Sequence, residues 1–185
     1  PYTTLFRSHK WIGGTGRNIP SFECFTSPDF RRTEGTIQTT EPLYRYGNKA
    51  TQIALTFKGG KVVDVKAKTG LEWVKKMIAE KGADMIGEFS LTDGRHSQIT
   101  KFMADTLFDE NVGGKYGNTH FALGKAYHDC FQGDPAKVTK EQWEEMGYND
   151  SVVHTDIVST SNRTVTATLR NGKKVVIYKN GQFQV

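Results

Sequence analysis

The sequence predicts an α+β domain that contains more strand than helix. Three observations support this fold class. Alternating apolar and polar runs lie on both sides of an Asn-Gly pair at residues 171–172, which is typical of a β-hairpin. A two-glycine turn at residues 59–60 separates another pair of β-rich runs. Residues 70–81, in contrast, carry apolar residues at helical spacing.

The first third of the chain is predicted to be mostly extended. Glycine, proline and serine are frequent at its beginning, without a sustained period, which favours loop and short strands. We expect residues 11–34 to form loop with short strands and residues 36–40 to form one strand. Residues 41–48 would be a connection, and residues 52–57 would pair with residues 61–68 in a hairpin.

The middle of the chain changes to a helical period. One face of the predicted helix over residues 70–81 carries Leu71, Val74, Met77 and Ile78. Gly82 fits the C-cap position of this helix. Residues 83–91 then form a short buried segment that contains Glu88.

The second half alternates between loop, helix and strand. Residues 97–107 are predicted to be helical in whole or in part, residues 113–118 form a glycine-rich loop, and residues 120–127 are either strand or helix. Thr139 and Gln142 have the spacing of a helical capping box. The tail is β, with strands over residues 151–159, 164–170 and 173–179 and a second Asn-Gly turn at residues 180–181.

Composition bounds the class of protein. The 185 residues suit one domain or slightly more, and apolar runs are too short to span a membrane. The net charge is +5, but charges of both signs are interspersed without a dense Lys/Arg block, so a nucleic-acid partner is not indicated. Cys24 and Cys130 form no CxxC pair, which favours reduced thiols in a cytoplasmic protein.

The first eight residues, PYTTLFRS, read like the translation of a sequencing-adapter oligonucleotide. They include no initiator Met and bear no evident relation to the rest of the chain. We therefore expect residues 1–8 to be non-native and residues 9–185 to be part of a larger two-domain protein whose N-terminal domain is missing.

Several residues of metal-ligand type occur in settings where burial is expected. Glu88 lies between apolar residues, and a buried carboxylate needs a partner. His154 and Asp156 flank Thr155 in a β-branched run, so they project from one face of a strand. Singly, each has an ordinary explanation: a buried Glu usually pairs with Lys or Arg, a lone His is usually a core residue, and residues 109–111 could be a capped turn.

Taken together, five segments resemble a known family. SFECFTSPD, GEFSLTD, TLFDEN, NTHFALGKAY and HTD occur in this order. They closely resemble the C-terminal catalytic portion of the M29 metallo-aminopeptidases, the aminopeptidase T and aminopeptidase S group. The resemblance runs from about residue 18 to the C-terminus. Cys24 stands where the family has an aliphatic residue, and residues 111–120 resemble the longer loop of some members.

The resemblance implies a set of site residues. Two divalent ions (zinc, cobalt or manganese) would be held by Glu23, Glu88, His120, His154 and Asp156. Carboxylates and imidazoles are ligands that suit these metals. Tyr127 would be a catalytic residue, and Glu88 would either bridge the ions or act as general base, which the sequence does not decide.

The resemblance also implies an activity. We expect a metal-dependent aminopeptidase that removes N-terminal amino acids from peptides with a free N-terminus, using a dinuclear metal-activated water. A homodimer of the full-length protein and a cytoplasmic location are further expectations, with no nucleic-acid or membrane partner. The alternatives are a catalytically inert fragment and a basic β-rich nucleic-acid-binding domain with stacking aromatics such as Tyr44 and Trp73.

Overall fold

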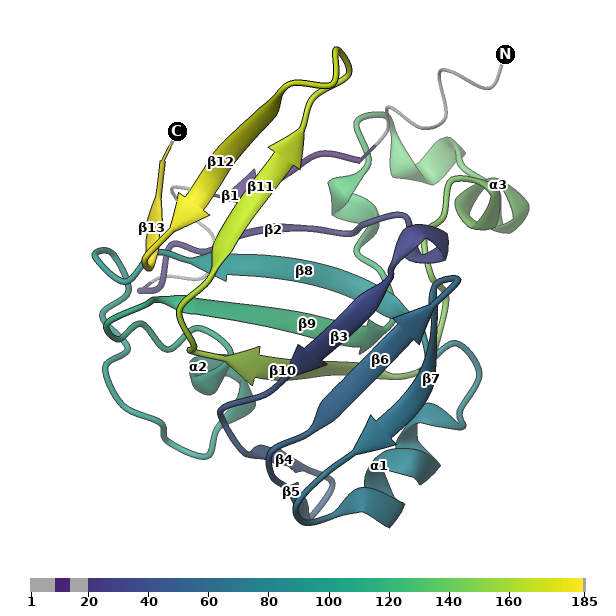
Figure 1. Cartoon of the computed structure of the whole chain (residues 1–185). Helices are drawn as coiled ribbons and strands as arrows, with labels where there is room; N and C mark the ends of the chain where they lie inside the picture. The colour runs from purple at the N-terminus through teal and green to yellow at the C-terminus, as the bar shows by residue number, and fades with distance from the viewer. Residues whose placement is uncertain (1–8, 14–19, 185) are drawn as a thin grey trace.

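A central antiparallel sheet of five strands organises the molecule (Figure 1). The computed structural model describes residues 9–13 and 20–184, so the octapeptide and residues 18–19, where the family resemblance begins, lie outside the described residues. In spatial order the strands are β1 (Ile12–Gly13), β2 (Cys24–Thr26), β8 (Ile86–Thr92), β9 (Asn118–Gly124) and β10 (His154–Ser159).

Two small sheets cross in front of the central sheet in the view of Figure 1. One contains β3 (Gly35–Gln38), β6 (Ala54–Lys58) and β7 (Lys61–Lys66). The other contains β11 (Thr164–Thr168), β12 (Lys174–Lys179) and β13 (Gln182–Phe183). A separate two-stranded hairpin pairs β4 (Leu43–Arg45) with β5 (Asn48–Ala50).

The helices of the described residues are short. They are α1 (Leu71–Ile78), α2 (Thr106–Asp109) and α3 (Lys140–Glu145), with 3-10 turns η2 (Phe30–Arg32), η3 (His128–Cys130) and η4 (Pro135–Lys137). The predicted α+β class, strand-rich with a few helices, is therefore confirmed. Within the described parts of the chain, we find no helix with the length and apolarity that a membrane crossing requires.

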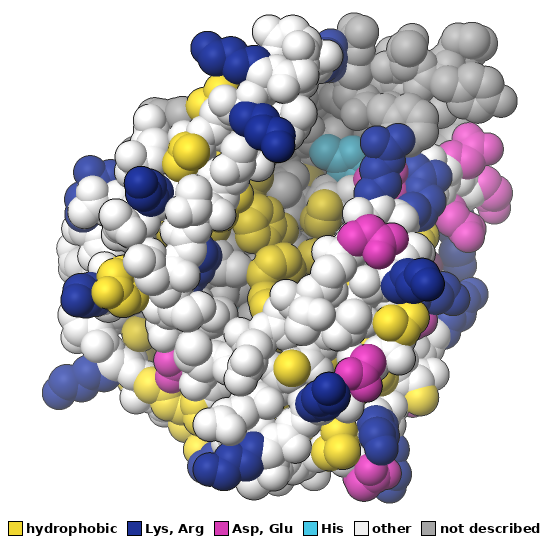
Figure 2. All heavy atoms as spheres, in the orientation of Figure 1, with side chains coloured by type: hydrophobic (Ala, Val, Ile, Leu, Met, Phe, Trp, Pro, Cys, Tyr) yellow, Lys and Arg dark blue, Asp and Glu magenta, His cyan; other side chains and the backbone are white. Residues whose placement is uncertain are grey.

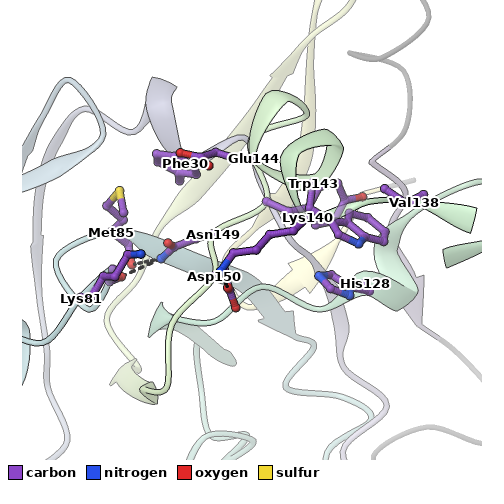
Figure 3. A pocket seen from close by; sticks show the side chains of 12 residues that line it. Phe30, Lys81, Met85, His128, Val138, Lys140, Trp143, Glu144, Asn149 and Asp150 are labelled. Atoms are coloured by element: carbon purple, nitrogen blue, oxygen red, sulfur yellow. Dashed lines mark hydrogen bonds and ion pairs between the residues drawn. The ribbon is translucent and has the colours of Figure 1, made fainter. Parts of the chain in front are cut away.

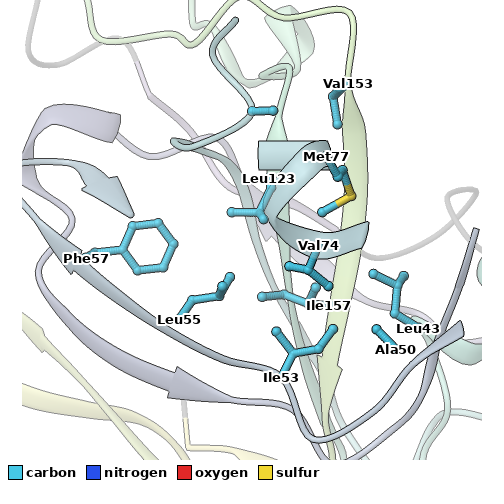
Figure 4. Packing of buried hydrophobic residues seen from close by; sticks show 11 residues of the cluster. Leu43, Ala50, Ile53, Leu55, Phe57, Val74, Met77, Leu123, Val153 and Ile157 are labelled. Carbon is cyan, nitrogen blue, oxygen red and sulfur yellow. The ribbon is translucent and has the colours of Figure 1, made fainter. Parts of the chain in front are cut away.

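The main hydrophobic core lies between the central sheet, β6 and α1 (Figure 4). Leu123 of β9 and Ile157 of β10 are 0% and 2% exposed and pack in the same cluster as Leu55 of β6 and Val74 of α1. Because side chains alternate along a strand, the residues between these positions point to the other face of the sheet. That second face is where the candidate site lies.

Local turn and cap signals are confirmed. Gly59 and Gly60 both have positive φ and connect β6 to β7, and the Asn180-Gly181 turn between β12 and β13 does the same. Thr139 caps α3 with the reciprocal hydrogen bonds of a capping box. These features depend on backbone conformations that Gly, Asn and Thr favour locally.

The prediction that residues 97–107 are helical in whole or in part holds only for the last two of them. Only α2 is helical, and it begins near the end of that range. The backbone groups of the earlier part bond to distant segments instead: Gln98 N–H donates to the Pro20 carbonyl, and the Ile99 carbonyl accepts from Gly113 N–H. These tertiary hydrogen bonds replace a helical ladder.

Two other predictions need correction. Residues 41–48 are more than a connection, because they form most of the β4–β5 hairpin, with Tyr46 and Gly47 both at positive φ. Gly82 is not the C-cap of α1, since Ala79 is. Gly82 instead lies in the following turn at φ +75°, where an added Cβ would approach the Asp150 carbonyl oxygen to 2.7 Å. Its small size is needed for chain packing rather than for capping.

Candidate metal centre

One face of the central sheet gathers the predicted ligand side chains. Glu88 of β8 and Asp156 of β10 both pair with Ala122 of β9, and His154 pairs with Gly124. Directly paired residues point to the same face, as do residues two positions apart on one strand. His120 of β9 therefore joins them, and the shared face predicted for His154 and Asp156 is consistent with this register.

A β-bulge turns Glu88 into the site. The pairing of β8 with β9 shifts between Ile86 and Glu88, which leaves Gly87 as the extra residue. An added Cβ at Gly87 would lie 2.3 Å from the Lys125 carbonyl oxygen and 2.4 Å from that of Gly124. Only glycine fits this close approach of two backbones.

Glu23 reaches the same face from the position just before β2. Its neighbour Cys24 pairs with Leu91, which brings the Glu23 carboxylate beside Ser90. The Ser90 hydroxyl donates a hydrogen bond of 2.6 Å to Oε2 of Glu23. Glu23 is 1% exposed and His120 is also 1% exposed, so this side of the cluster is closed to solvent.

The two imidazoles point their Nε2 atoms at the carboxylates. Nε2 of His120 lies 3.5 Å from an oxygen of Glu23, 3.5 Å from Glu88 and 3.9 Å from Asp156. Nε2 of His154 lies 3.4 Å from Glu88 and 3.6 Å from Asp156. These separations exceed normal hydrogen-bond lengths, and they suit atoms that share an ion.

The opposite ring nitrogens are held by backbone carbonyls. Nδ1 of His120 lies 2.7 Å from the Glu110 carbonyl oxygen, and Nδ1 of His154 lies 2.8 Å from that of Lys125. A carbonyl accepts only, so each Nδ1 carries the proton. In a neutral ring, Nε2 then presents a lone pair to the carboxylates, as metal-binding histidines do.

The site has the donors for two ions. Glu23, Glu88 and His120 form one group of mutually close ligand atoms, and Glu88, His154 and Asp156 form another. We call them the inner group and the outer group; Glu88 belongs to both. Oδ1 of Asp156 is buried without a hydrogen-bond partner among the described residues, and buried polar atoms rarely lack one. The residues therefore fit divalent cations.

The pKa shifts show an excess of negative charge. Burial raises the pKa of Glu23, and His120 and Ser90 offset this only in part. Burial and the charge of Asp156 raise the pKa of Glu110 to about 9. Burial also acts to raise the pKa of Glu88, but close contact with the two histidines lowers it to about 2. The raised pKa values mean that Glu23 and Glu110 tend to retain protons in the absence of cations. Bound cations would stabilise the ionised carboxylates instead.

Glu110 is the site residue that the sequence reasoning missed. From the sequence, residues 109–111 could be an ordinary capped turn, but in the structure the Glu110 carboxyl group hydrogen-bonds with that of Asp156. The Glu110 carbonyl accepts from His120 and also from the Asn118 side chain, 2.7 Å away. The available signal was TLFDEN, one of the motifs that carry the resemblance.

Tyr127 lies at the open side of the cluster. It follows β9 in a loop, where its N–H donates to the Ser27 hydroxyl at 2.8 Å. Its ring contacts His154 edge to face, with centroids 4.9 Å apart, and the side chain is 43% exposed. Burial and the nearby carboxylates, Glu88 first, raise the pKa of Tyr127, which keeps its hydroxyl protonated.

A cavity of about 370 Å³ lies elsewhere (Figure 3). None of the described residues that line it is a predicted site residue, although His128 follows Tyr127 in the chain. The His128 ring stacks on Trp143 with centroids 3.9 Å apart, and Lys140 is 3.5 Å from Asp150 across the cavity lining. The described lining contains neither the inner nor the outer group, so the cavity is distinct from the candidate metal centre.

The opposite face of the sheet is mostly apolar. Figure 2 shows a hollow between the two small sheets in which hydrophobic side chains gather. Phe89 and Phe121 alternate with the site residues and therefore point to this side, with ring centroids 5.1 Å apart. Lys and Arg side chains are spread over the face shown in Figure 2, so it carries no continuous basic patch of the kind that binds nucleic acid.

Comparison with known proteins agrees with the geometry. The chain is 36% identical to aminopeptidase PepS of Streptococcus thermophilus, covering 98% of this chain and 46% of the relative. It is 33% identical to aminopeptidase 2 of Geobacillus stearothermophilus, over 97% of this chain and 45% of the relative. The chain thus spans about half the length of the curated relatives it matches.

A solved structure is also similar. Wild-type AmpT from Thermus thermophilus superposes with a TM-score of 0.81 at 29% identity, covering 96% of this chain and 45% of that one. The family model described as thermophilic metalloprotease (M29) matches residues 3–183, which is nearly the whole chain and includes part of the octapeptide. The chain therefore belongs to the M29 family of metalloproteases.

Proposed function

We propose that this chain is the catalytic part of a metal-dependent aminopeptidase, which removes N-terminal amino acids from peptides with a free N-terminus. One observation carries the proposal: two groups of metal-ligand atoms share the Glu88 carboxylate at the centre of a buried cluster. Relatives of the chain are named aminopeptidases, which supports peptides as the substrate class.

Five side chains would hold two divalent ions, zinc, cobalt or manganese: Glu23, Glu88, His120, His154 and Asp156. Such ions supply a water nucleophile at neutral pH and polarise the scissile carbonyl. The protein's own contribution is to hold the ligands in place. It fixes both histidines through their Nδ1 atoms and points Glu88 inward through the bulge at Gly87.

Two carboxylates are candidates for proton transfer. Glu88 would either help to hold both ions or act as general base, and its contacts with both histidines suit the first of these roles. Glu110 lies against Asp156 and holds a proton up to about pH 9 when no cation is bound, as its raised pKa indicates. A buried carboxyl group that retains a proton at neutral pH can act as a general acid. Either of these carboxylates, or an ion, could also hold the substrate's α-amino group.

Tyr127 would contact the substrate. Its raised pKa keeps the phenol protonated, so the hydroxyl can donate a hydrogen bond to a developing oxyanion. The exposed position of Tyr127 beside His154 indicates that peptides approach from the outer group.

The full-length protein would contain more than this chain. Since the chain spans about half of its relatives, we propose that the complete enzyme has a further N-terminal domain and is a cytoplasmic homodimer. The adapter origin of residues 1–8 also stays a prediction. The same coverage supports an alternative, that these 185 residues bind metal and are catalytically inert by themselves.

The first test is metal content. The chain is stripped with a chelator, dialysed against limiting zinc or cobalt, and analysed for metal per protein. Close to two ions per chain supports the site; hydrolysis of a dipeptide, compared with its N-acetylated form, then tests exopeptidase activity. Two ions without hydrolysis favours the inert alternative. A folded chain that retains no ion contradicts the proposal.

A further inference from the structure

The inner and outer groups differ in their surroundings. The side chains of Glu23 and His120 are each 2% exposed, whereas that of His154 is 24% exposed. An ion in the inner group would therefore be enclosed by protein, and an ion in the outer group would remain open to water and substrate. Enclosure alone does not provide affinity, since the ligands must also be held in a binding geometry.

Ser90 provides that constraint for the inner group. It is fully buried on β8, two residues beyond Glu88, and pairs with His120 on one side and with Phe25 on the other. Its side chain therefore points to the site face, between the strands that carry Glu23 and His120.

The direction of its hydrogen bond is unambiguous. Glu23 as a carboxylate only accepts, so the 2.6 Å contact requires the Ser90 hydroxyl to donate to Oε2. The same Oε2 faces Nε2 of His120 at 3.5 Å. Ser90 thus holds the oxygen that faces the imidazole, and the rotational freedom of Glu23 is lost before any ion arrives.

We propose that Ser90 is a positioning residue, which presets Glu23 and makes the inner group the tighter of two sites for a divalent cation. In the outer group, the corresponding oxygen, Oδ1 of Asp156, faces both imidazoles but has no hydrogen-bond partner among the described residues. This inference rests on the proposed function in one respect: divalent ions must bind to this cluster.

The test is titration of the metal-free chain with Zn²⁺ in the presence of a competing chelator. Wild type is expected to bind in two steps of different affinity. Ser90→Ala is expected to weaken the tighter step by about 10–100-fold, the usual effect of losing an outer contact to a metal ligand, and to leave the weaker step unchanged. Ser90→Thr keeps a hydroxyl and is expected to restore the tighter step.

Ser159→Ala is the matched control. Ser159 is also a buried serine of the central sheet, but its hydroxyl bonds to Ser161 at 2.9 Å, and neither residue belongs to the site. Both binding steps should keep their wild-type affinity in this variant. Thermal unfolding of each metal-free variant tests whether it folds. If Ser90→Ala does not fold, Ser90→Cys replaces it, because the thiol has a similar shape but is a weaker hydrogen-bond donor.

The outcomes separate this inference from the function. If wild type binds two ions and Ser90→Ala (or Ser90→Cys) keeps both affinities, the positioning role is wrong and the metal centre stands. Equal weakening of both steps also overturns it, since Ser90 would then support the whole sheet face. If wild type binds no Zn²⁺, both this inference and the proposed metal centre fail.

Discussion

Glu88 and Asp156 face each other across one alanine. They occupy the strands on either side of β9, and both pair directly with Ala122, whose side chain is the only one between them in the register. Ala122 is fully buried. The space between the two carboxylates therefore depends on a side chain that ends at Cβ.

Enlarging Ala122 should close that space. In Ala122→Leu the new side chain would occupy the volume between Glu88 and Asp156, so we expect the chain to retain fewer ions than wild type. Overpacking should also cost about 1–3 kcal/mol of stability. Ala83→Leu, at a fully buried alanine of the main core, controls for that cost and should keep wild-type metal content. Equal metal content in the two variants would show that ions do not bind beside Ala122.

Removing the charge of Glu88 should remove activity without unfolding the chain. Glu88→Gln keeps the shape of the side chain but loses the charge shared by both groups. The loss of several kcal/mol of transition-state stabilisation corresponds to at least about 10²–10³-fold in rate. Peptide hydrolysis and metal content are the measurements, with circular dichroism to verify folding and exposed Glu80→Gln as control. Full activity in Glu88→Gln would falsify the site assignment.

Tyr127→Phe should separate binding from catalysis. The ring keeps its contacts with His154 and Phe25, and only the hydroxyl is lost. We expect unchanged metal content, little change in KM, and a fall in kcat of about 10²–10³-fold, the usual cost of losing one oxyanion donor. Tyr46→Phe, at a 70% exposed tyrosine, is the control. A variant with wild-type kcat would assign Tyr127 a packing role.

Asp93 should make stability depend on acid pH. It is fully buried, receives hydrogen bonds from Arg95 and from Phe183 N–H, and so links the segment after β8 to β13. Burial opposes its charge, but hydrogen bonding to Arg95 prevails and lowers the pKa of Asp93 below its ordinary value of 3.8. The stabilisation is therefore present above pH 3.8 and is lost as pH falls through the folded-state pKa.

The measurement is thermal unfolding of metal-free Asp93→Asn beside wild type. At pH 7 the variant should be less stable by on the order of 1 kcal/mol, or about 2–4 °C in Tm for a chain of this size. The difference should shrink as the pH falls below 3.8. Asp64→Asn removes a half-exposed carboxylate whose contact with Lys66 is 3.6 Å long, and it should change Tm little at either pH. A difference for Asp93→Asn that persists at low pH would contradict the charge-based explanation.

The sequence by itself determined the features that depend on neighbouring residues. The turns at residues 59–60 and 180–181 require positive φ, which Gly and Asn adopt readily, and α1 and the capping box of α3 depend on side chains three or four residues apart. His154 and Asp156 are likewise two residues apart on one strand. Ordered motifs were enough to name the family, which the match over residues 3–183 confirms.

Only the tertiary structure decided how distant residues meet. Glu23 and Asp156 enter one cluster because five strands pair in a particular order and register, which no local preference specifies. The segment expected to be helical over residues 97–107 bonds to Pro20 and Gly113 instead, and Glu110 enters the site next to α2 at the end of that loop. Local conformational preferences act over a few residues, whereas strand register and loop contacts are set by burial and hydrogen bonding across the whole chain.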